Sequence, residues 1–324
     1  MKYAALNLIA VPLALAALQG GAQAATYPDK PIRMLVGFAP GGGTDTTART
    51  IAQPLSEALG QQVVVDNRPG AAGNIAADIA SKSPPDGYTL LMGTIAALAI
   101  NPSLYKSLPF DPIKDFEPVT LAVSSTNVLA VHPSVAAKNV RELIALAKAQ
   151  SGKLSYGSSG IGGAGHLAGV LFDNMAGTTT VHIPYKGGAP AMIALISGEV
   201  QMVFATAETA VPQIKTGKIR ALGVTMAKRT ALLPDLPTIA EAGVPGYEAN
   251  NWYGILLPAK TPRAILDRLS RESVKVLNSP VIKEQLFRQG LDASPSTPQE
   301  FSAYIKSEMA KWAKVVQAAN IRID

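Results

Sequence analysis

Residues 32–45 read Ile-Arg-Met-Leu-Val-Gly-Phe-Ala-Pro-Gly-Gly-Gly-Thr-Asp, an apolar strand followed at once by a glycine-rich turn. Beyond the turn, Ile51, Leu55 and Leu59 recur at the spacing of one helix face. Further strand, helix and strand patterns follow at 63–65, 76–81 and 89–92. Such alternation is typical of an α/β sheet whose consecutive strands run parallel through right-handed crossovers.

The second half of the chain repeats this design. A strand pattern at 154–157 leads into another glycine-rich turn at 158–165, which reads Ser-Ser-Gly-Ile-Gly-Gly-Ala-Gly, and then into a helix. Two apolar, strand-like stretches, 119–131 and 252–257, connect the halves. A last helix opens with the capping box Thr-Pro-Gln-Glu at 297–300, and its apolar stripe suits packing against the first half.

These patterns predict an α/β protein of two lobes, each a mainly parallel sheet flanked by helices, with a two-strand hinge between them. A chain of this length exceeds one comfortable core, which also favours two lobes. We expect residues 26–124 and 251–324 to form the first lobe and 125–250 the second.

The first 25 residues have the pattern of a secretory signal peptide. Lys2 supplies a positive start, residues 6–18 are apolar, and Ala22-Gln23-Ala24 suits cleavage near Ala24 or Ala25. The apolar run is shorter than the roughly 20 residues that span a bilayer. We therefore expect a mature protein that is free in the periplasm.

Composition excludes several classes of function. The 324 residues include no cysteine and three histidines, so neither a disulfide nor a zinc site is expected. Lysine and arginine number 29 against 23 acidic residues, for a net charge of +6, which suits an acidic small ligand. The basic residues are scattered and aromatic residues make up 6%, so no nucleic-acid surface is expected.

Three segments are candidates for a ligand site. In open α/β sheets, ligands bind beyond the carboxyl ends of the strands, where helices begin. Residues 37–45, 93–95 and 158–165 occupy such positions and are rich in small residues, so their backbone N–H groups can face an anion. Asp45 is better placed to cap the first helix than to contact a ligand.

Nucleotide binding is disfavoured at both glycine turns. The first resembles a phosphate-binding loop, but Gly43-Thr44 stands where that loop needs a lysine. The second contains a G-x-G-x-x-G pattern from Gly160, yet no acidic residue ends the next strand, where Lys186 lies instead.

Hydrolysis is also disfavoured. Ser158 or Ser159 with His166 could suggest a catalytic pair, but the G-x-S-x-G elbow is missing. An enzyme thus remains the weaker alternative, and no cofactor or metal is expected. Lys186 sits between a strand and a helix, where a ligand contact and a solvated loop lysine are equally compatible with the pattern.

Longer motifs along the chain resemble the Bug-type receptors of tripartite tricarboxylate transporters. The matching segments lie at 27–32, 38–42, 67–74, 84–91, 101–102, 158–160, 166–168, 185–187, 234–243 and 258–262. They follow the family's order and cover nearly the whole chain beyond the leader.

The resemblance implies a periplasmic binding protein of the Venus flytrap type, whose lobes close on a carboxylate. In such receptors the turns matching 38–45 and 186–188 hold the carboxylate like a pincer, and the segments matching 94–95 and 158–162 line the same cleft. It also implies a membrane permease with one large and one small subunit as partner. We expect a monomer, and a receptor in place of an enzyme.

One departure from the family pattern bears on the ligand. Many relatives carry Asp-Asn after Phe where this chain has Ala205-Thr206, so an acidic partner for a ligand ammonium is missing. Together with the apolar stretch 96–100, this favours a di-acid or an aromatic acid over an amino acid. The alternative to transport is a ligand-loaded sensor that docks on a receptor kinase.

The predicted ligand-binding residues come from five short segments. They are Phe38, Ala39, Pro40, Gly41, Gly42, Gly43, Asp45, Thr94, Ile95, Ser158, Ser159, Gly160, Ile161, Lys186, Gly187, Gly188, Ala205 and Thr206.

Overall fold

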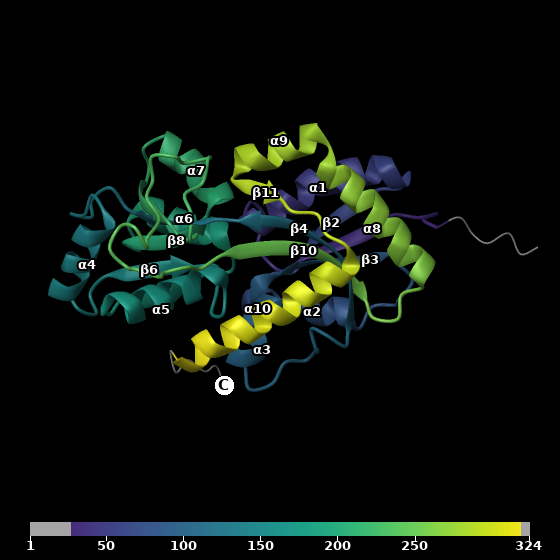
Figure 1. Ribbon diagram of the computed structural model, residues 1–324, viewed down its shortest axis with the longest axis horizontal. Helices are drawn as coiled ribbons and strands as arrows, with labels where there is room; N and C mark the ends of the chain where they lie inside the picture. The colour runs from purple at the N-terminus through teal and green to yellow at the C-terminus, as the bar shows by residue number, and fades with distance from the viewer. Residues whose placement is uncertain (1–26, 319–324) are drawn as a thin grey trace, which may run out of the picture.

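The computed structural model describes residues 27–318, so the expected leader lies outside the described residues. Two sheets with helices on both faces form two lobes that lie side by side (Figure 1). The two-lobed α/β fold expected from the sequence is therefore present.

The sheet of the first lobe has six strands in the order β11-β4-β10-β3-β1-β2. Their bounds are β1 Ile32–Val36, β2 Val63–Asn67, β3 Thr89–Thr94, β4 Phe116–Ser125, β10 Asn251–Pro258 and β11 Leu291–Ala293. Strand β1 lies between β3 and β2, and four of its five residues are fully buried, as the apolar run predicts.

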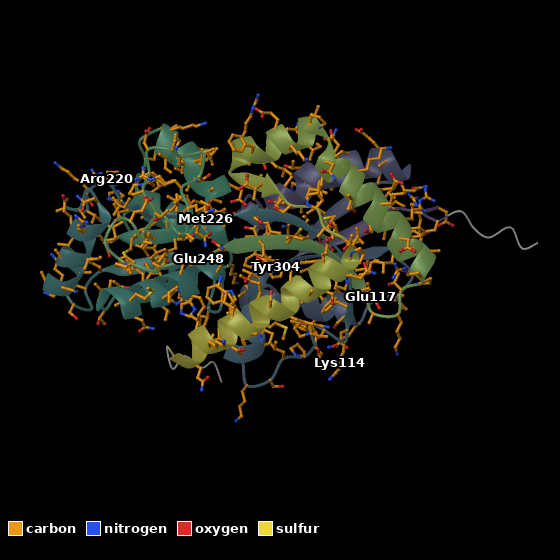
Figure 2. All side chains as sticks on the ribbon, viewed as in Figure 1. Lys114, Glu117, Arg220, Met226, Glu248 and Tyr304 are labelled. Carbon is orange, nitrogen blue, oxygen red and sulfur yellow. The ribbon has the colours of Figure 1, made fainter. Side chains whose placement is uncertain are left out.

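Six helices cover this sheet. They are α1 Gly43–Leu59, α2 Asn74–Ser81, α3 Asn101–Leu104, α8 Arg263–Asn278, α9 Pro280–Gln289 and α10 Pro298–Ala318. One face packs against α1, α8 and α9, and the other packs against α2, α3 and α10. Tyr304 of α10 lies against Trp252 of β10, with ring centroids 5.6 Å apart (Figure 2). The expected capping box is present, since Thr297 N donates to Glu300 Oε2 at 2.8 Å.

The sheet of the second lobe has five strands in the order β7-β6-β8-β5-β9. The strands are β5 Asn127–Val131, β6 Ser155–Ser158, β7 Val181–Pro184, β8 Met202–Thr206 and β9 Arg220–Val224. The helices are α4 Val140–Ala149, α5 Ala164–Ala176, α6 Gly188–Ser197 and α7 Ala207–Lys215. Helices α4 and α5 cover one face, and α6 and α7 cover the other.

In each sheet most strands run in one direction, and antiparallel neighbours complete the sheet. The expected parallel part is present in each, as β2-β1-β3 and β7-β6-β8. The remaining strands pair antiparallel: β10 with β3 and β4, β11 with β4, and β5 with β8 and β9. The antiparallel pairs follow from the path of the chain. It leaves the first sheet along β4, enters the second along β5 and returns to the first along β10.

Two crossings join the lobes. Strand β4 ends at Ser125 and β5 begins at Asn127, so Thr126 alone separates the two sheets along the first crossing. On the return, Ala249 N still donates to Thr225 O in the second lobe at 2.9 Å, while Asn251 already pairs with Ser125 in the first. The stretch expected to be one long strand is thus broken at a single residue.

Candidate ligand-binding cleft

A cavity of about 50 Å³ lies between the lobes, beyond the carboxyl ends of β1, β3, β6 and β8. This is room for a few water molecules. Its lining consists of Phe38, Gly42, Gly43, Thr44, Thr94, Ile95, Ala96, Gly157, Ser158, Ser159, Ala164, Gly165, Gly188, Ala191, Met192, Val203, Phe204, Ala205, Thr206, Asn251 and Tyr253. None of these lining residues is an acid, a base or a histidine, so a charged ligand would meet backbone groups and hydroxyls.

Four helices begin at this cavity. Helix α1 starts at Gly43, α5 at Ala164, α6 at Gly188 and α7 at Ala207. The N-cap residues of these four helices make no side-chain capping hydrogen bond, whereas Asn139 caps α4 at a distance from the cleft. At α7, Ala207 N donates to Thr126 O at 2.9 Å and the Glu208 carboxyl group accepts from its own N–H, so the open N-termini are those of α1, α5 and α6. The first N–H groups of an uncapped helix have no partner within the helix, and the helix dipole makes them attractive to an anion.

Thr94 contributes an unpaired hydroxyl to the same space. Its side chain is 4% exposed, and Oγ1 has no hydrogen-bond partner in the described protein. A buried hydroxyl without a partner costs about 1–3 kcal/mol, so such groups are uncommon unless a ligand or water completes them. Thr94 ends β3 and lines the cavity, which makes its hydroxyl a polar contact ready for a ligand.

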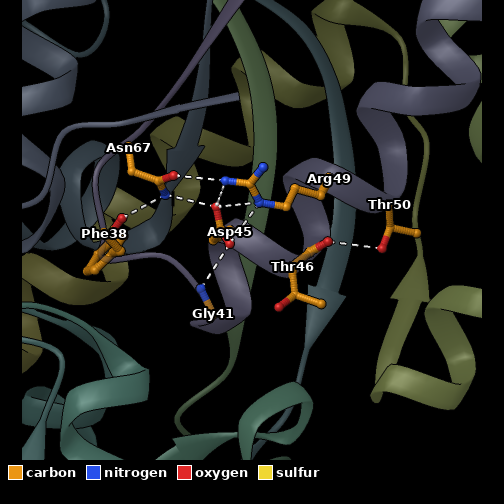
Figure 3. Close-up of polar contacts among 7 residues, drawn as sticks. All are labelled: Phe38, Gly41, Asp45, Thr46, Arg49, Thr50 and Asn67. Carbon is orange, nitrogen blue, oxygen red and sulfur yellow. Dashed lines mark hydrogen bonds and ion pairs between the residues drawn. The ribbon is translucent and has the colours of Figure 1, made fainter. Parts of the chain in front are cut away.

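The first glycine turn is held in shape by Asp45 (Figure 3). Its carboxylate accepts hydrogen bonds from Gly41 N at 2.9 Å, Asn67 Nδ2 at 2.9 Å and Arg49 Nε at 3.1 Å. Asn67 Nδ2 also donates to Phe38 O at 3.0 Å, which fixes the start of the turn. Burial alone would raise the pKa of Asp45, but these hydrogen bonds outweigh it and hold the pKa below its usual value. Asp45 thus positions the turn and leaves the ligand side to the backbone.

The second glycine turn is held by Ser158. Its hydroxyl donates to Gly160 O at 3.0 Å and accepts from Gly160 N at 3.1 Å. His182 Nε2 lies 2.6 Å from the same oxygen, and since the hydroxyl proton is already used, His182 is the donor there. Ser158 lines the cavity, but its hydrogen-bonding capacity is spent inside the lobe.

His182 stacks on His166, with ring centroids 4.0 Å apart. His166 Nδ1 accepts from Gly162 N at 3.1 Å, so the pair supports both ends of the turn. Burial lowers the pKa of His166 to about 4, and burial together with His166 lowers that of His182 to about 3. Both rings are therefore neutral around pH 7, and the hydrogen bond that His166 Nδ1 accepts requires an unprotonated nitrogen at that position.

A main-chain hydrogen bond connects the first glycine turn to the second lobe across the cleft. Ala39 N donates to Lys186 O at 3.2 Å, which joins the first turn to the loop before α6. The side chain of Lys186 is exposed and does not line the cavity. Lys186 therefore contributes its carbonyl to the contact between the lobes, and its ammonium group faces solvent.

The structure brings together more than half of the predicted ligand-binding residues. Those that line the cavity are Phe38, Gly42, Gly43, Thr94, Ile95, Ser158, Ser159, Gly188, Ala205 and Thr206. The others lie outside the lining and belong to the same turns: Ala39, Pro40, Gly41, Asp45, Gly160, Ile161, Lys186 and Gly187.

Several lining residues were not anticipated. Thr44 and Ala164 lie within the candidate segments 37–45 and 158–165 but were not singled out, and Ala191 and Met192 lie one turn into α6, where helical spacing from Gly188 could have found them. Tyr253, like its neighbour Asn251, comes from β10 and lies opposite Thr94 in the antiparallel pair with β3. No local pattern predicts that pairing.

The fold and the cleft define a two-lobed solute-binding protein. Its two sheets, its paired crossings and a cavity faced by uncapped helix N-termini are those of a receptor that encloses a small solute. Within residues 27–318 no cluster of metal-ligating side chains is found, and no helix there has the length and apolarity to cross a membrane.

The chain belongs to the tripartite tricarboxylate transporter family receptors, whose sequence profile matches residues 47–321. BugT of Bordetella pertussis is 35% identical over 319 residues and covers 98% of both chains. A protein encoded in the tcbD–tcbE intergenic region of Pseudomonas sp. strain P51 is 38% identical over 291 residues, which cover 90% of this chain and 86% of the relative.

Solved structures of relatives share the fold. R. palustris Rpa4515 with adipate matches with a TM-score of 0.90 and 39% identity over 91% of this chain and 99% of the other. The periplasmic binding protein BugD matches with a TM-score of 0.88 and 34% identity over 91% and 99%. MatC of Rhodopseudomonas palustris with bound malate gives 0.86 and 28% identity over 90% and 100%. The chain is accordingly a substrate-binding receptor and not an enzyme.

Proposed function

We propose that this protein binds a small carboxylate in the cleft between its lobes and delivers it to a tripartite transporter permease. The observation that carries the proposal is the convergence of three uncapped helix N-termini, α1, α5 and α6, on a cavity whose lining has no charged side chain. Thr94 adds a buried hydroxyl that lacks a partner. Such a site attracts an anion without an arginine or lysine.

The available interactions suffice for a working affinity. A micromolar receptor needs a binding free energy of about −8 kcal/mol. Hydrogen bonds to a charged group contribute about 1.5–3 kcal/mol each, and each helix N-terminus adds about 0.3–1 kcal/mol or more when shielded from water. Three or four N–H and O–H donors at two N-termini therefore reach this range after ordering costs.

The remainder of the cavity favours a hydrocarbon or aromatic body on the ligand. Ala191, Met192, Val203 and Ala205 form an apolar wall. None of the lining residues could pair with a ligand ammonium as a carboxylate would. We infer a di-acid or an aromatic acid in preference to an amino acid, in line with the adipate and malate named for the two relatives.

The cellular setting is part of the proposal. We infer export by cleavage near Ala24 or Ala25, residence in the periplasm, action as a monomer, and a permease partner with one large and one small subunit. We also propose to divide the chain into 26–124 with 251–324 and 125–250, since the crossings between the sheets fall at Thr126 and Asn250.

Thermal unfolding with a ligand panel tests the proposal. Adipate, malate, benzoate and glutamate are added at equal concentration to the purified protein, and the shift in Tm is recorded. A ligand that binds the folded state raises Tm, by mass action, as its concentration exceeds Kd. We expect adipate or benzoate to give the largest shift and glutamate the smallest. A panel in which no acid shifts Tm, together with no co-purified acid in native mass spectrometry, would overturn the proposal.

A further inference from the structure

Glu208 connects the two lobes through its side chain. It lies in the first turn of α7 in the second lobe, and the residue is 8% exposed. Ser125, the last residue of β4 in the first lobe, donates to its two carboxyl oxygens at 3.1 and 3.3 Å. At the start of α1, a Cβ on Gly43 would lie 3.0 Å from Glu208 Oε1. The carboxyl group is therefore enclosed only when α1 and α7 are together.

The groups around this carboxyl group are almost all neutral. Its hydrogen-bonding neighbours include Ser125, Thr206 and Tyr253, and burial raises the pKa of Tyr253 well above its usual value, so that phenol stays protonated. The charged groups of the packed elements are engaged elsewhere. On α1, Asp45 pairs with Arg49, and on α9, Arg288 pairs with Glu284. Among the described residues no basic side chain pairs with Glu208, so only its hydrogen bonds and the N-terminus of α7 offset a buried negative charge.

We propose that Glu208 takes up a proton when the lobes close on a carboxylate, so that this receptor binds its ligand together with one proton. The inference rests on the proposed function, because it requires an anion in the cleft. Glu208 itself does not line the cavity, but Gly43 and Thr206 lie between its carboxyl group and that space. A ligand carboxylate and an ionised Glu208 would thus be two like charges on either side of a thin wall.

Burial is the main physical cause. It raises the pKa of Glu208 from its ordinary value of 4.5 to about 7, although hydrogen bonds limit the rise. A ligand anion nearby raises the pKa further, since a like charge favours the neutral form. When the lobes separate, water reaches the carboxyl group and its pKa returns toward the ordinary value. The closed form thus holds a proton that the open form has lost, and ligand affinity falls as the pH rises.

Calorimetry in buffers of different ionisation enthalpy measures this proton directly, with adipate as the first probe and the other panel acids as alternatives. We expect uptake of about one proton per ligand at pH 6, and an affinity about tenfold weaker at pH 8 than at pH 6. Glu208→Gln should bind without this uptake and without the tenfold change. Glu199→Gln, an exposed glutamate of the same lobe that pairs with Tyr185, is the matched control and should behave as the wild type.

The outcomes separate the two proposals. If no panel acid binds, the proposed function fails. If an acid binds but the wild type takes up no proton, or if Glu208→Gln retains the same uptake, only the inference about Glu208 is overturned. Should Glu208→Gln not fold, carbon-13 NMR of labelled glutamate carboxyl groups in the wild type measures the protonation of Glu208 directly. The carboxyl group of one glutamate must then titrate near neutral pH, and its pKa must rise when the acid is added. The absence of such a resonance would also overturn the inference about Glu208.

Discussion

The amide nitrogen of Ala39 and the carbonyl oxygen of Lys186 lie 3.2 Å apart and form a hydrogen bond across the mouth of the cleft. A main-chain bond at this place needs close approach of two loops. Gly187 allows it, because its φ of 148° is rarely adopted by other residues and a Cβ there would lie 3.0 Å from Ala39 N. The first glycine turn and the loop at Lys186 and Gly187 can thus meet at the backbone and shield an anion from solvent.

Gly43→Ala should weaken ligand binding by tenfold or more. A Cβ at this position would lie 2.5 Å from Thr206 Oγ1 and would hold α1 away from the second lobe. The substitution favours the helix itself, so the free protein should not lose stability. Titration calorimetry with adipate measures the affinity.

The control for this variant is the neighbouring Gly42→Ala. Its Cβ would meet Ala39 O at 3.5 Å and Gly188 N at 3.6 Å, which are ordinary contacts. We expect a smaller loss of affinity. Equal losses in the two variants would show that steric contact with Thr206 does not control closure.

Thr94→Val should weaken ligand affinity without lowering the stability of the free protein. Valine has the same shape but lacks the unpaired hydroxyl, so the free protein should keep or gain stability by up to about 1 kcal/mol. Binding of adipate should weaken by about 1.5–3 kcal/mol, the contribution of a hydrogen bond to a charged group. Ser273→Ala is the control, because this α8 hydroxyl is equally buried and unpaired but is absent from the cavity lining. Unchanged affinity in Thr94→Val would remove this hydroxyl from the site.

Asp45→Asn should destabilise the protein by about 1–2 kcal/mol at pH 7, because the hydrogen bonds from Gly41 and Arg49 lose their charged acceptor. The pKa of Asp45 is lowered on folding, so its contribution is present above the ordinary value of 3.8 and is lost as the pH falls through the lower folded pKa. Urea unfolding of both proteins at pH 7 and near pH 3 measures the difference. A gap that does not shrink in acid would contradict the role assigned to this carboxylate.

His182→Gln should make folding less sensitive to acid. The pKa of His182 is depressed on folding to about 3, so its contribution to stability is complete above the unfolded value near 6.5 and is lost as the pH falls below it. Between pH 7 and pH 5 this histidine should cost the wild type about 1–2 kcal/mol.

Urea unfolding at pH 7 and pH 5 compares the wild type with this variant. Glu208 acts in the opposite direction, since the pKa of its carboxyl group is raised on folding and stability is lost as the pH rises from 4.5 to about 7. Its effect is the same in both proteins and cancels in the comparison. His132→Gln, outside the stacked pair, serves as the control. An identical pH dependence in wild type and His182→Gln would show that the stacked pair does not resist protonation.

Local sequence patterns predict the strands, glycine turns and helix starts, because these depend on residues close together in the chain. A buried strand such as 32–36 followed by glycine and a helical period places Gly42 and Gly43 at a helix start whatever the rest of the chain does. The same holds for the second turn and its strand. Both turns reach the cavity because carboxyl ends of parallel strands share one edge of a sheet.

What the patterns could not predict depends on contacts between distant segments. Tyr253 faces the cavity because β10 pairs with β3, more than 150 residues earlier in the chain. Lys186 was considered for its charge, yet only the folded loop shows that its carbonyl makes the contact. The burial of Glu208 results from both lobes together, so its sequence position at a helix start carries no indication of its pKa.

The connection between the lobes has a thermodynamic consequence. Strands β4 and β10 stay paired up to Ser125 and Asn251, and single residues, Thr126 and Asn250, carry the chain across. Few backbone torsions therefore separate the two sheets, and few need to be fixed if the lobes close on a ligand. Fixing the backbone of one residue costs roughly 1–2 kcal/mol, so a long flexible linker would consume much of the binding free energy. A connection this short leaves most of that free energy available for holding the ligand.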